Sequence, residues 1–224
     1  MIKEENRKGF TLAEVLITLA IIGVVAVMTI PTLIKKYEQK VTITKLKHTY
    51  SLLNQAYKLS VVDNGELHDW NLTTTSEPVQ YVKKYWFPYF KGAKLCETYS
   101  DCGYTKPRPW NKPSGIVSQE DVTGTTARSA FILQDGTVIS FRIPPKNQSE
   151  LSPKINIDIN GGKLPNVAGK DYFFLGVNEK GVFPLYADYT QEKIEKLCKD
   201  ETTASSCFAK IVNDGWQIKS DYPW

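Results

Sequence analysis

The sequence is poor in the residues that most often carry catalysis or bind transition metals, with two histidines and four cysteines among 224 residues. It contains no Walker-type phosphate loop, no HExxH pair and no CxxC pair. His48 lies in a lysine-rich stretch, and the run His68-Asp69-Trp70 is too local to form a triad, whose members are recognised by spatial geometry. The sequence therefore argues against an enzyme.

Net charge is also small, because 28 Lys and Arg against 24 Asp and Glu leave +4. A balance of this size does not favour nucleic acid or an acidic membrane surface as a partner. The run from Tyr81 to Lys91 mixes rings with three lysines, but so many rings in one short run favour head-domain packing over stacking on single-stranded nucleic acid. With 42% hydrophobic and 23% charged residues, the chain is expected to fold into one or two domains.

Charge is almost missing from residues 10–34, where Glu14 is the single charged residue and eighteen of twenty-five side chains are strongly apolar. The twenty uncharged residues from Val15 to Ile34 would span roughly 30 Å as a helix, the hydrocarbon thickness of a bilayer. We expect one membrane-spanning helix. The stretch is too long for an ordinary cleaved signal peptide, whereas an uncleaved signal anchor remains an alternative. Lysines and arginines flank both ends, so they do not decide the orientation.

Glu14 is the residue that a plain anchor would not need. A carboxylate at the centre of a spanning helix costs about 2.5–3.5 kcal/mol on insertion scales. Its presence suggests a partner cation, and a free amino group made by cutting the chain just before Phe10 is one candidate. An acid that reaches the membrane interface is the alternative.

The run Lys8-Gly9-Phe10-Thr11-Leu12-Ala13-Glu14-Val15-Leu16 resembles the processing site of the type IV pilin and type II secretion pseudopilin superfamily. The resemblance implies cleavage after Gly9 by prepilin peptidase and N-methylation of Phe10, with residues 1–9 as the leader. It also implies that Glu14, the fifth mature residue, sets the register of each subunit against its neighbour's amino terminus.

Gly23 and Pro31 fall where the same family often places residues that loosen the helix. Proline lacks the amide donor and disrupts the hydrogen-bond ladder about four residues back. A stretch of helix that melts during assembly and a simple kink at the membrane exit are both compatible with Pro31.

Beyond the lipid segment, residues 35–62 continue the helix as an amphipathic stretch. Gaps of three to five residues separate the members of one apolar and aromatic stripe, which are Tyr37, Val41, Leu46, Tyr50, Leu53, Tyr57 and Val61. Asn64-Gly65 provides a stop. One helix is therefore expected from about Phe10 to Val62, roughly 80 Å long. Its first part, residues 10–34, would lie in the membrane or in a filament core.

Residues 63–224 are predicted to form a globular head with an antiparallel sheet of four or five strands. Asp135-Gly136 predicts a two-residue hairpin turn between two strands rich in β-branched residues. Further strands are expected over residues 154–159, 172–177 and 182–186, while residues 66–125 are expected to be a loop-rich insertion. A long helix packed on a later antiparallel sheet is an α+β fold, and the resemblance makes it a pilin-like one.

The four cysteines form two near pairs along the chain, and four cysteines allow three connectivities. Local pairing closes the shortest loops, so we predict Cys96 with Cys102 and Cys198 with Cys207, as suits a head delivered to an oxidising compartment. Zinc is disfavoured because neither spacing matches a structural knuckle.

A glycine turn carries short oxygen-bearing side chains, and some major pseudopilins hold calcium in a head loop. Asp158, Asn160 and Asp171 are the expected ligands if calcium is bound. The turn supplies only two carboxylates and departs from the EF-hand pattern, so side chains that bond their own backbone are favoured over calcium. No cofactor is expected to be required.

The resemblance predicts a structural subunit of a type IV pilus-like filament or of a type II secretion pseudopilus. The expected partners are copies of this chain, other pilins or pseudopilins, prepilin peptidase, an inner-membrane assembly platform and the lipid bilayer. The chain would cross the bacterial inner membrane once before assembly and reach a periplasmic or cell-surface filament afterwards. A signal-anchored periplasmic binding protein or enzyme, with an uncleaved helix, is the alternative.

Overall fold

A computed structural model of the chain describes residues 9, 11–70, 78–124, 127–143 and 153–223. The chain divides into two compact units, Met1–Val41 and Thr42–Trp224. Helix α1 (Leu12–Asn64) supplies most of the first unit and the opening helix of the second. The second unit thus begins inside the stretch expected to be the amphipathic continuation of the helix.

Within the second unit, α1 follows the predicted apolar stripe. Leu46 and Leu53 have no exposed surface, and Tyr57 is also buried. The helix ends at Asn64, two residues beyond the predicted end at Val62, and Gly65 follows with φ +81°. Glycine adopts that left-handed conformation readily, which explains why the helix stops there.

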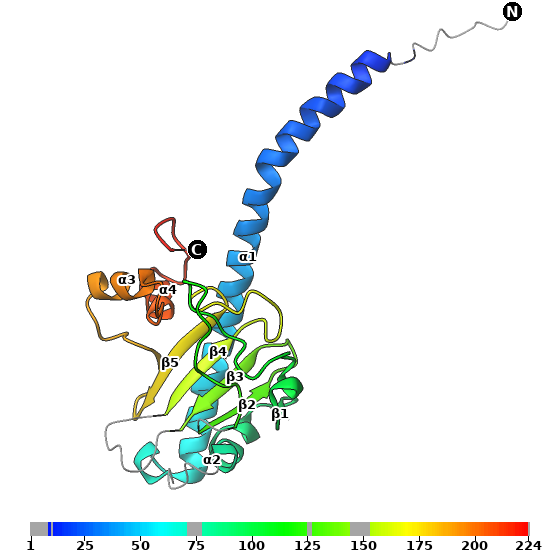
Figure 1. Cartoon of the computed structure of the whole chain (residues 1–224). Coiled ribbons are helices and arrows are strands. Elements are labelled where there is room, and N and C mark those ends of the chain that lie inside the picture. Colours follow the sequence, from blue (N-terminus) through cyan, green and yellow to red (C-terminus); the bar gives the residue numbers. More distant parts are fainter. Residues whose placement is uncertain (1–8, 10, 71–77, 125–126, 144–152, 224) are drawn as a thin grey trace, which may run out of the picture. The chain divides into compact units, whose positions relative to one another are not determined.

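A six-stranded antiparallel sheet, in the order β1 to β6, forms the centre of the second unit (Figure 1). Five strands lie where the sequence predicted them, and β1 is an additional edge strand inside the segment expected to be loop-rich. The strands are β1 (Lys94–Cys96), β2 (Arg128–Ile132), β3 (Val138–Arg142), β4 (Lys154–Asp158), β5 (Tyr172–Asn178) and β6 (Gly181–Pro184). Helix and sheet together confirm the predicted α+β, pilin-like fold class.

The hairpin between β2 and β3 is wider than predicted. Leu133 N donates to Thr137 O at 2.8 Å, so three residues form the loop instead of the expected two. Gly136 is its last residue and has φ +84°, while the Asp135 carboxylate accepts from the Thr137 amide at 3.0 Å. A left-handed glycine at this position is typical of three-residue hairpin loops.

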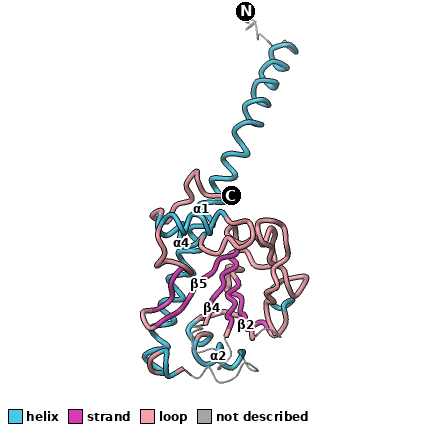
Figure 2. Tube along the Cα trace, turned by 60° about the vertical axis from the view of Figure 1, so that its left-hand side comes forward, coloured by secondary structure: helices cyan, strands magenta, loops and turns pink. Residues whose placement is uncertain are grey.

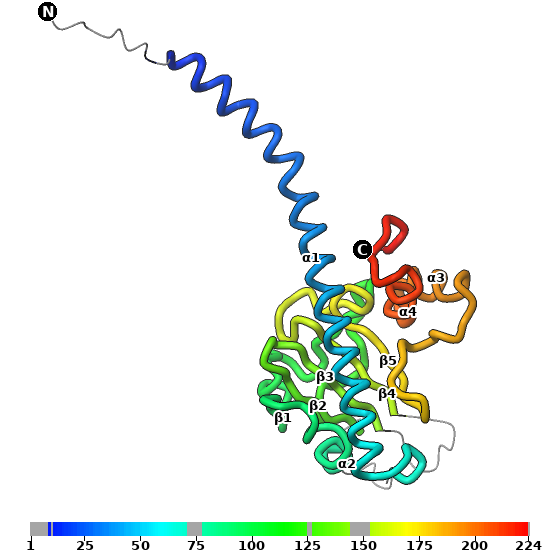
Figure 3. Tube along the Cα trace, turned by 180° about the vertical axis from the view of Figure 1, so that it is seen from behind, coloured from blue at the N-terminus to red at the C-terminus, as the bar shows by residue number. Residues whose placement is uncertain are grey.

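The two faces of the sheet differ in character because side chains alternate along each strand. One face is apolar and packs against α1, as Figure 3 shows from behind; its buried members are Phe131, Ile139, Phe141, Ile155, Ile157, Phe173 and Leu175. The other face carries polar residues, among them Ser140 and Asn156. The segment before β2, green in Figure 1, crosses this polar face and stacks Trp110 on Tyr172 at 4.3 Å.

The segment expected to be loop-rich contains helix α2 (Pro78–Tyr85) and three short 3₁₀ helices, Leu67–Asp69, Phe87–Tyr89 and Tyr99–Cys102. Its aromatic run packs into the core, as predicted. Trp86 has no exposed surface and its ring centroid lies 5.0 Å from that of Phe141 on β3.

Helices α3 (Gln191–Lys199) and α4 (Cys207–Asn213) follow the sheet and were not predicted (Figure 2). Lys210 of α4 is fully buried, and its Nζ lies 2.9 Å from Asp214 and 2.6 Å from Asp221. The Tyr222 hydroxyl donates to the Gly169 carbonyl. Ion pairs to the buried Lys210 and the buried Tyr222 therefore attach the last residues to the head.

Candidate functional site

The first part of α1 has the surface of a membrane-inserted or filament-core helix. Its large apolar side chains are exposed, including Leu12 at 76%, Val27 at 75% and Met28 at 72%. In the part of the chain that the structure describes, α1 is the one helix long and apolar enough to cross a membrane. Two threonine hydroxyls within this stretch bond carbonyls of their own helix, Thr18 to Val15 and Thr29 to Val25, both at 2.9 Å. Polar groups that would otherwise face lipid are thereby satisfied.

Glu14 closes a capping box with Thr11 at the start of α1. The Thr11 amide and hydroxyl each donate to Glu14 Oε2 at 2.8 Å, and the Glu14 amide donates to Thr11 Oγ1 at 3.3 Å. This reciprocal arrangement satisfies amides that have no partner inside the helix. The sequence pattern Thr-x-x-Glu signals such a box, and the sequence reasoning overlooked it.

Gly9 is exposed just before this cap, whereas Phe10 lies outside the described residues. Cleavage between Gly9 and Phe10 and methylation of Phe10 therefore remain predictions. Gly23 and Pro31 lie inside α1, which stays helical through both. Pro31 has no amide to donate to the Val27 carbonyl, which is a reason to expect a weaker helix at this point. Loosening of the helix here also remains a prediction.

Two disulfides join Cys96 to Cys102 and Cys198 to Cys207, the same two pairs that loop closure favours. The first connects the end of β1 to the 3₁₀ helix after it, and the second connects α3 to the start of α4. All four cysteines are buried, with 1% exposure or less. Both disulfides therefore lie inside the core of the head.

Asp158, one of the expected calcium ligands, ends β4 under the segment that crosses the polar face. Its Oδ2 accepts from the Tyr104 hydroxyl and the Trp110 indole, both at 2.8 Å. Its Oδ1 accepts from the amides of Asn160 at 3.2 Å and Gly161 at 2.9 Å. Burial and the charge of Asp171 raise the pKa of Asp158 to about 7, although the hydrogen bonds oppose the shift.

Asp171 closes the same turn from the other side. It accepts from the amides of Asn166 at 2.7 Å and Val167, and from Asn160 Nδ2 at 3.1 Å. Burial raises its pKa as well. The structure therefore brings the three expected ligands into one turn.

The residues do not fit a calcium shell in this geometry. An ionised carboxylate offers about four lone-pair positions, and four protein donors already occupy those of Asp158. Asn160 Oδ1 is buried without a hydrogen-bond partner, but one such oxygen does not make a six-ligand shell. Among the described residues, no group of three or more His, Cys, Asp or Glu side chains could hold a metal ion. The geometry instead resembles the hydrogen-bonded turn that the sequence favoured, and calcium remains a prediction.

An exposed apolar helix that starts at the Thr11–Glu14 capping box and continues into an α+β head is a pilin-like architecture. A family model for the prokaryotic N-terminal methylation motif matches residues 6–30, which include the predicted cleavage site and Glu14. The chain therefore carries the processing motif of type IV pilins and type II secretion pseudopilins. A second model, described as a family of unknown function, matches residues 32–107. Comparisons with curated proteins and with solved structures gave no match.

Proposed function

We propose that this chain is a structural subunit of a type IV pilus-like filament or of a type II secretion pseudopilus. The methylation motif makes it a prepilin peptidase substrate of the pilin or pseudopilin kind. The observation that carries the further step is the exposed apolar surface of α1, most of which lies within the residues that the motif matches. Such a surface needs lipid before assembly and other helices afterwards.

Assembly would bury these apolar side chains between copies of the helix. Because these side chains would leave lipid and not water, the driving force would come from close van der Waals packing between the helices and from contacts of their polar groups. Glu14 would pair with the methylated amino group of a neighbouring subunit. In an apolar environment, opposite charges attract more strongly than in water, so the pair would define the register.

The partners that follow are prepilin peptidase, other pilins or pseudopilins and an inner-membrane assembly platform. The subunit would be stored in the inner membrane, which the helix and the motif support, and would then enter a periplasmic or cell-surface filament. A structural subunit has no reaction to catalyse, so we propose no enzymatic activity.

Mass spectrometry of the protein purified from its native cells tests this function. The expected mature chain begins at Phe10 and carries one methyl group on its amino terminus. A chain that still begins at Met1 would instead support a signal-anchored periplasmic binding protein or enzyme. Immunogold labelling of sheared filaments would then show whether the mature chain is assembled.

A further inference from the structure

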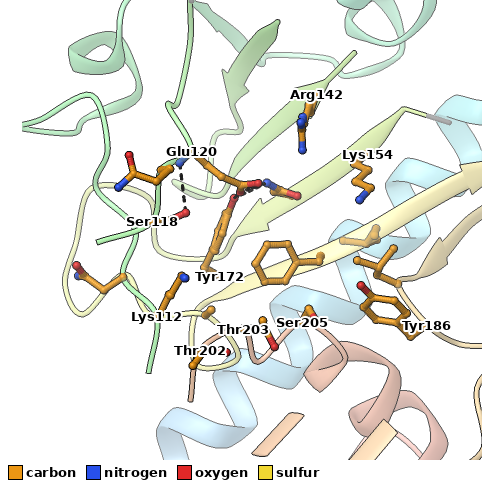
Figure 4. Close-up of a pocket in the computed structure, with 17 residues that line it drawn as sticks. Lys112, Ser118, Glu120, Arg142, Lys154, Tyr172, Tyr186, Thr202, Thr203 and Ser205 are labelled. Carbon is orange, nitrogen blue, oxygen red and sulfur yellow. Dashed lines mark hydrogen bonds between the residues drawn. The ribbon is translucent and has the colours of Figure 1, made fainter. Parts of the chain in front are cut away.

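A pocket of about 360 Å³ lies on the polar face of the sheet (Figure 4). Strands β3, β4 and β5 form its floor, and residues 111–120 and 202–205 form its walls. Its volume falls in the lower part of the range of roughly 300–1,000 Å³ found for small-ligand sites.

Two cations stand beside each other at one end of this pocket. Arg142 and Lys154 are direct cross-strand partners in the register of β3 and β4, so their side chains share the polar face. Figure 4 shows both reaching into the pocket. Like charges at directly opposite positions destabilise a sheet. Neither side chain has an ion-pair partner among the described residues, so no acid in this part of the chain offsets their repulsion.

The one acid that lines the pocket is already neutralised. Glu120 Oε1 lies 2.7 Å from Arg128, which has 2% exposure and is the next cation in the same cross-strand row. Glu120 Oε2 accepts from the Tyr172 hydroxyl at 2.8 Å and from Asn156 Nδ2 at 3.1 Å. Its charge and lone pairs are thus used by the wall of the pocket. Arg142 and Lys154 are left to attract an anion.

The remaining walls combine hydroxyls and a third cation, Lys112, with aromatic rings. Lys112 lies with the hydroxyl groups of Ser118, Thr202, Thr203 and Ser205, on the side opposite Arg142 and Lys154 (Figure 4). Rings of Tyr172, Phe174 and Tyr186 line the floor and one side. Hydroxyls suit the polar edges of a sugar, while flat rings suit its apolar face. A plain inorganic anion would leave these walls without contacts.

From this arrangement we infer that the pocket binds an acidic saccharide, with the sugar carboxylate held between Arg142 and Lys154 and the sugar ring packed on Phe174. This role goes beyond that of a filament subunit. It gives the outward-facing head a ligand of its own.

Saturation-transfer difference NMR on the full-length protein tests the inference, in a detergent without a sugar headgroup. Sodium glucuronate is the probe and glucose is its uncharged counterpart. Glucuronate should bind, and glucose should bind about tenfold more weakly or worse, since a charge-assisted contact contributes roughly 1.5–3 kcal/mol. Acetate and triglutamate complete the set as a free carboxylate and an acidic peptide, and both should bind more weakly than glucuronate.

Arg142→Gln and Lys154→Gln should each weaken glucuronate binding about tenfold. Lys180→Gln is the matched control, because it removes the same charge from the exposed turn between β5 and β6, and its affinity should stay within about twofold of wild type. The melting temperatures of both pocket variants should stay the same or rise, because the repulsion between the two strands is relieved.

The inference would be overturned by equal binding of glucose and glucuronate, or by pocket variants that bind as well as wild type. Acetate binding as tightly as glucuronate would reveal an anion site without sugar recognition and would also overturn it. Tighter binding of triglutamate would assign the pocket to an acidic peptide instead. None of these outcomes affects the amino-terminal mass measurement, so the inference and the proposed filament role fail independently.

Discussion

At the scale of single residues, Glu14 has one observed contact, with Thr11, and one proposed contact, with a neighbouring subunit. In the isolated chain its carboxylate accepts two hydrogen bonds from Thr11, which reduces the cost of an acid next to lipid. In a filament the same carboxylate would face the amino group of another subunit. The cap is therefore a satisfied resting state that assembly would exchange for an ion pair.

Glu14→Ala is expected to leave membrane insertion intact or improved, because an acid is removed from an apolar segment. It should strongly reduce incorporation into filaments, measured by quantifying the subunit in sheared filament fractions. Thr11→Ala is the control, since it removes the capping hydroxyl at a cost of about 1 kcal/mol and keeps the carboxylate. Equal losses in both variants would assign Glu14 to capping alone, and normal incorporation of Glu14→Ala would remove the register role.

The raised pKa of Asp158 predicts that the stability of the head depends on pH. Its pKa of about 7 in the folded head exceeds the value of about 3.9 expected in the unfolded chain, so the folded state binds the proton more tightly. The contribution of this proton to the free energy of unfolding is fully present below about pH 4. It is lost as the pH rises through about 7, and the total loss is about 4 kcal/mol.

Asp171→Asn should flatten this dependence, because the neighbouring charge that helps to raise the pKa of Asp158 is removed. Denaturant unfolding followed by tryptophan fluorescence at several pH values between 5 and 8 measures both slopes. The variant will be less stable overall, since Asp171 also bonds backbone amides, so the slope and not the absolute free energy is the readout. Identical slopes would contradict the assignment.

Calcium is expected to change head stability very little, because four protein donors already surround Asp158. Melting temperatures in millimolar calcium and in EGTA should agree within about 1 °C, since ligand stabilisation follows RT ln(1 + [L]/Kd) and a weak site adds almost nothing. A rise of several degrees in calcium would show that Asp158, Asn160 and Asp171 rearrange into a true shell.

At the scale of elements, the Cys198–Cys207 disulfide supports the short pair α3 and α4. Helix α3 has nine residues and α4 has seven, which are too few for a helix to be stable alone in water. These helices therefore depend on tertiary contacts and on the cross-link. Phe208 of α4 packs in the core. Its ring centroid lies 5.6 Å from that of Tyr50 on α1 and 6.2 Å from that of Phe173 on β5.

The double variant Cys198→Ala/Cys207→Ala should lower the free energy of unfolding by roughly 2–4 kcal/mol, measured in denaturant. Cys96→Ala/Cys102→Ala is the matched comparison, because its loop is of similar length and its cysteines are equally buried. Thiol labelling of the wild-type protein without reductant should modify no cysteine. Modification of all four would contradict both disulfides.

At the scale of the whole molecule, the second unit starts at Thr42 and includes α1 from there to its end at Asn64. Its buried helix residues, such as Leu46, Leu53 and Tyr57, are part of the same core as the sheet. We therefore propose that the independently folding head is residues 42–224, longer than the head of residues 63–224 expected from composition.

A chain of residues 42–224 should unfold cooperatively, whereas a chain of residues 65–224 should not fold. The shorter chain lacks several buried side chains of α1, and each contributes about 2–5 kcal/mol to the free energy of unfolding. Their sum exceeds a typical total stability of roughly 5–15 kcal/mol. Near-ultraviolet circular dichroism during thermal unfolding distinguishes the two. A cooperative transition in the shorter chain would place the boundary after α1.

The features that could be predicted from the sequence are those encoded locally. Charge depletion over residues 10–34, the processing motif and the apolar stripe after it all act through neighbours within a few positions. Five strands were predicted for the same reason, since alternation along one strand reveals its buried face. Strand β1 was missed because three residues carry too little of this pattern, and α3 and α4 because their apolar stripes are short.

The sequence by itself determined the methylation motif, the long apolar stretch and the α+β class of this protein, because a short motif, hydrophobic length and periodicity need no partner to be read. The tertiary structure alone decided which distant side chains meet. Tyr104 and Trp110 occupy the lone pairs of Asp158 across about fifty residues of chain, and the register of β3 with β4 sets Arg142 beside Lys154. Such contacts depend on how the strands and loops pack in three dimensions, and no local pattern specifies that packing.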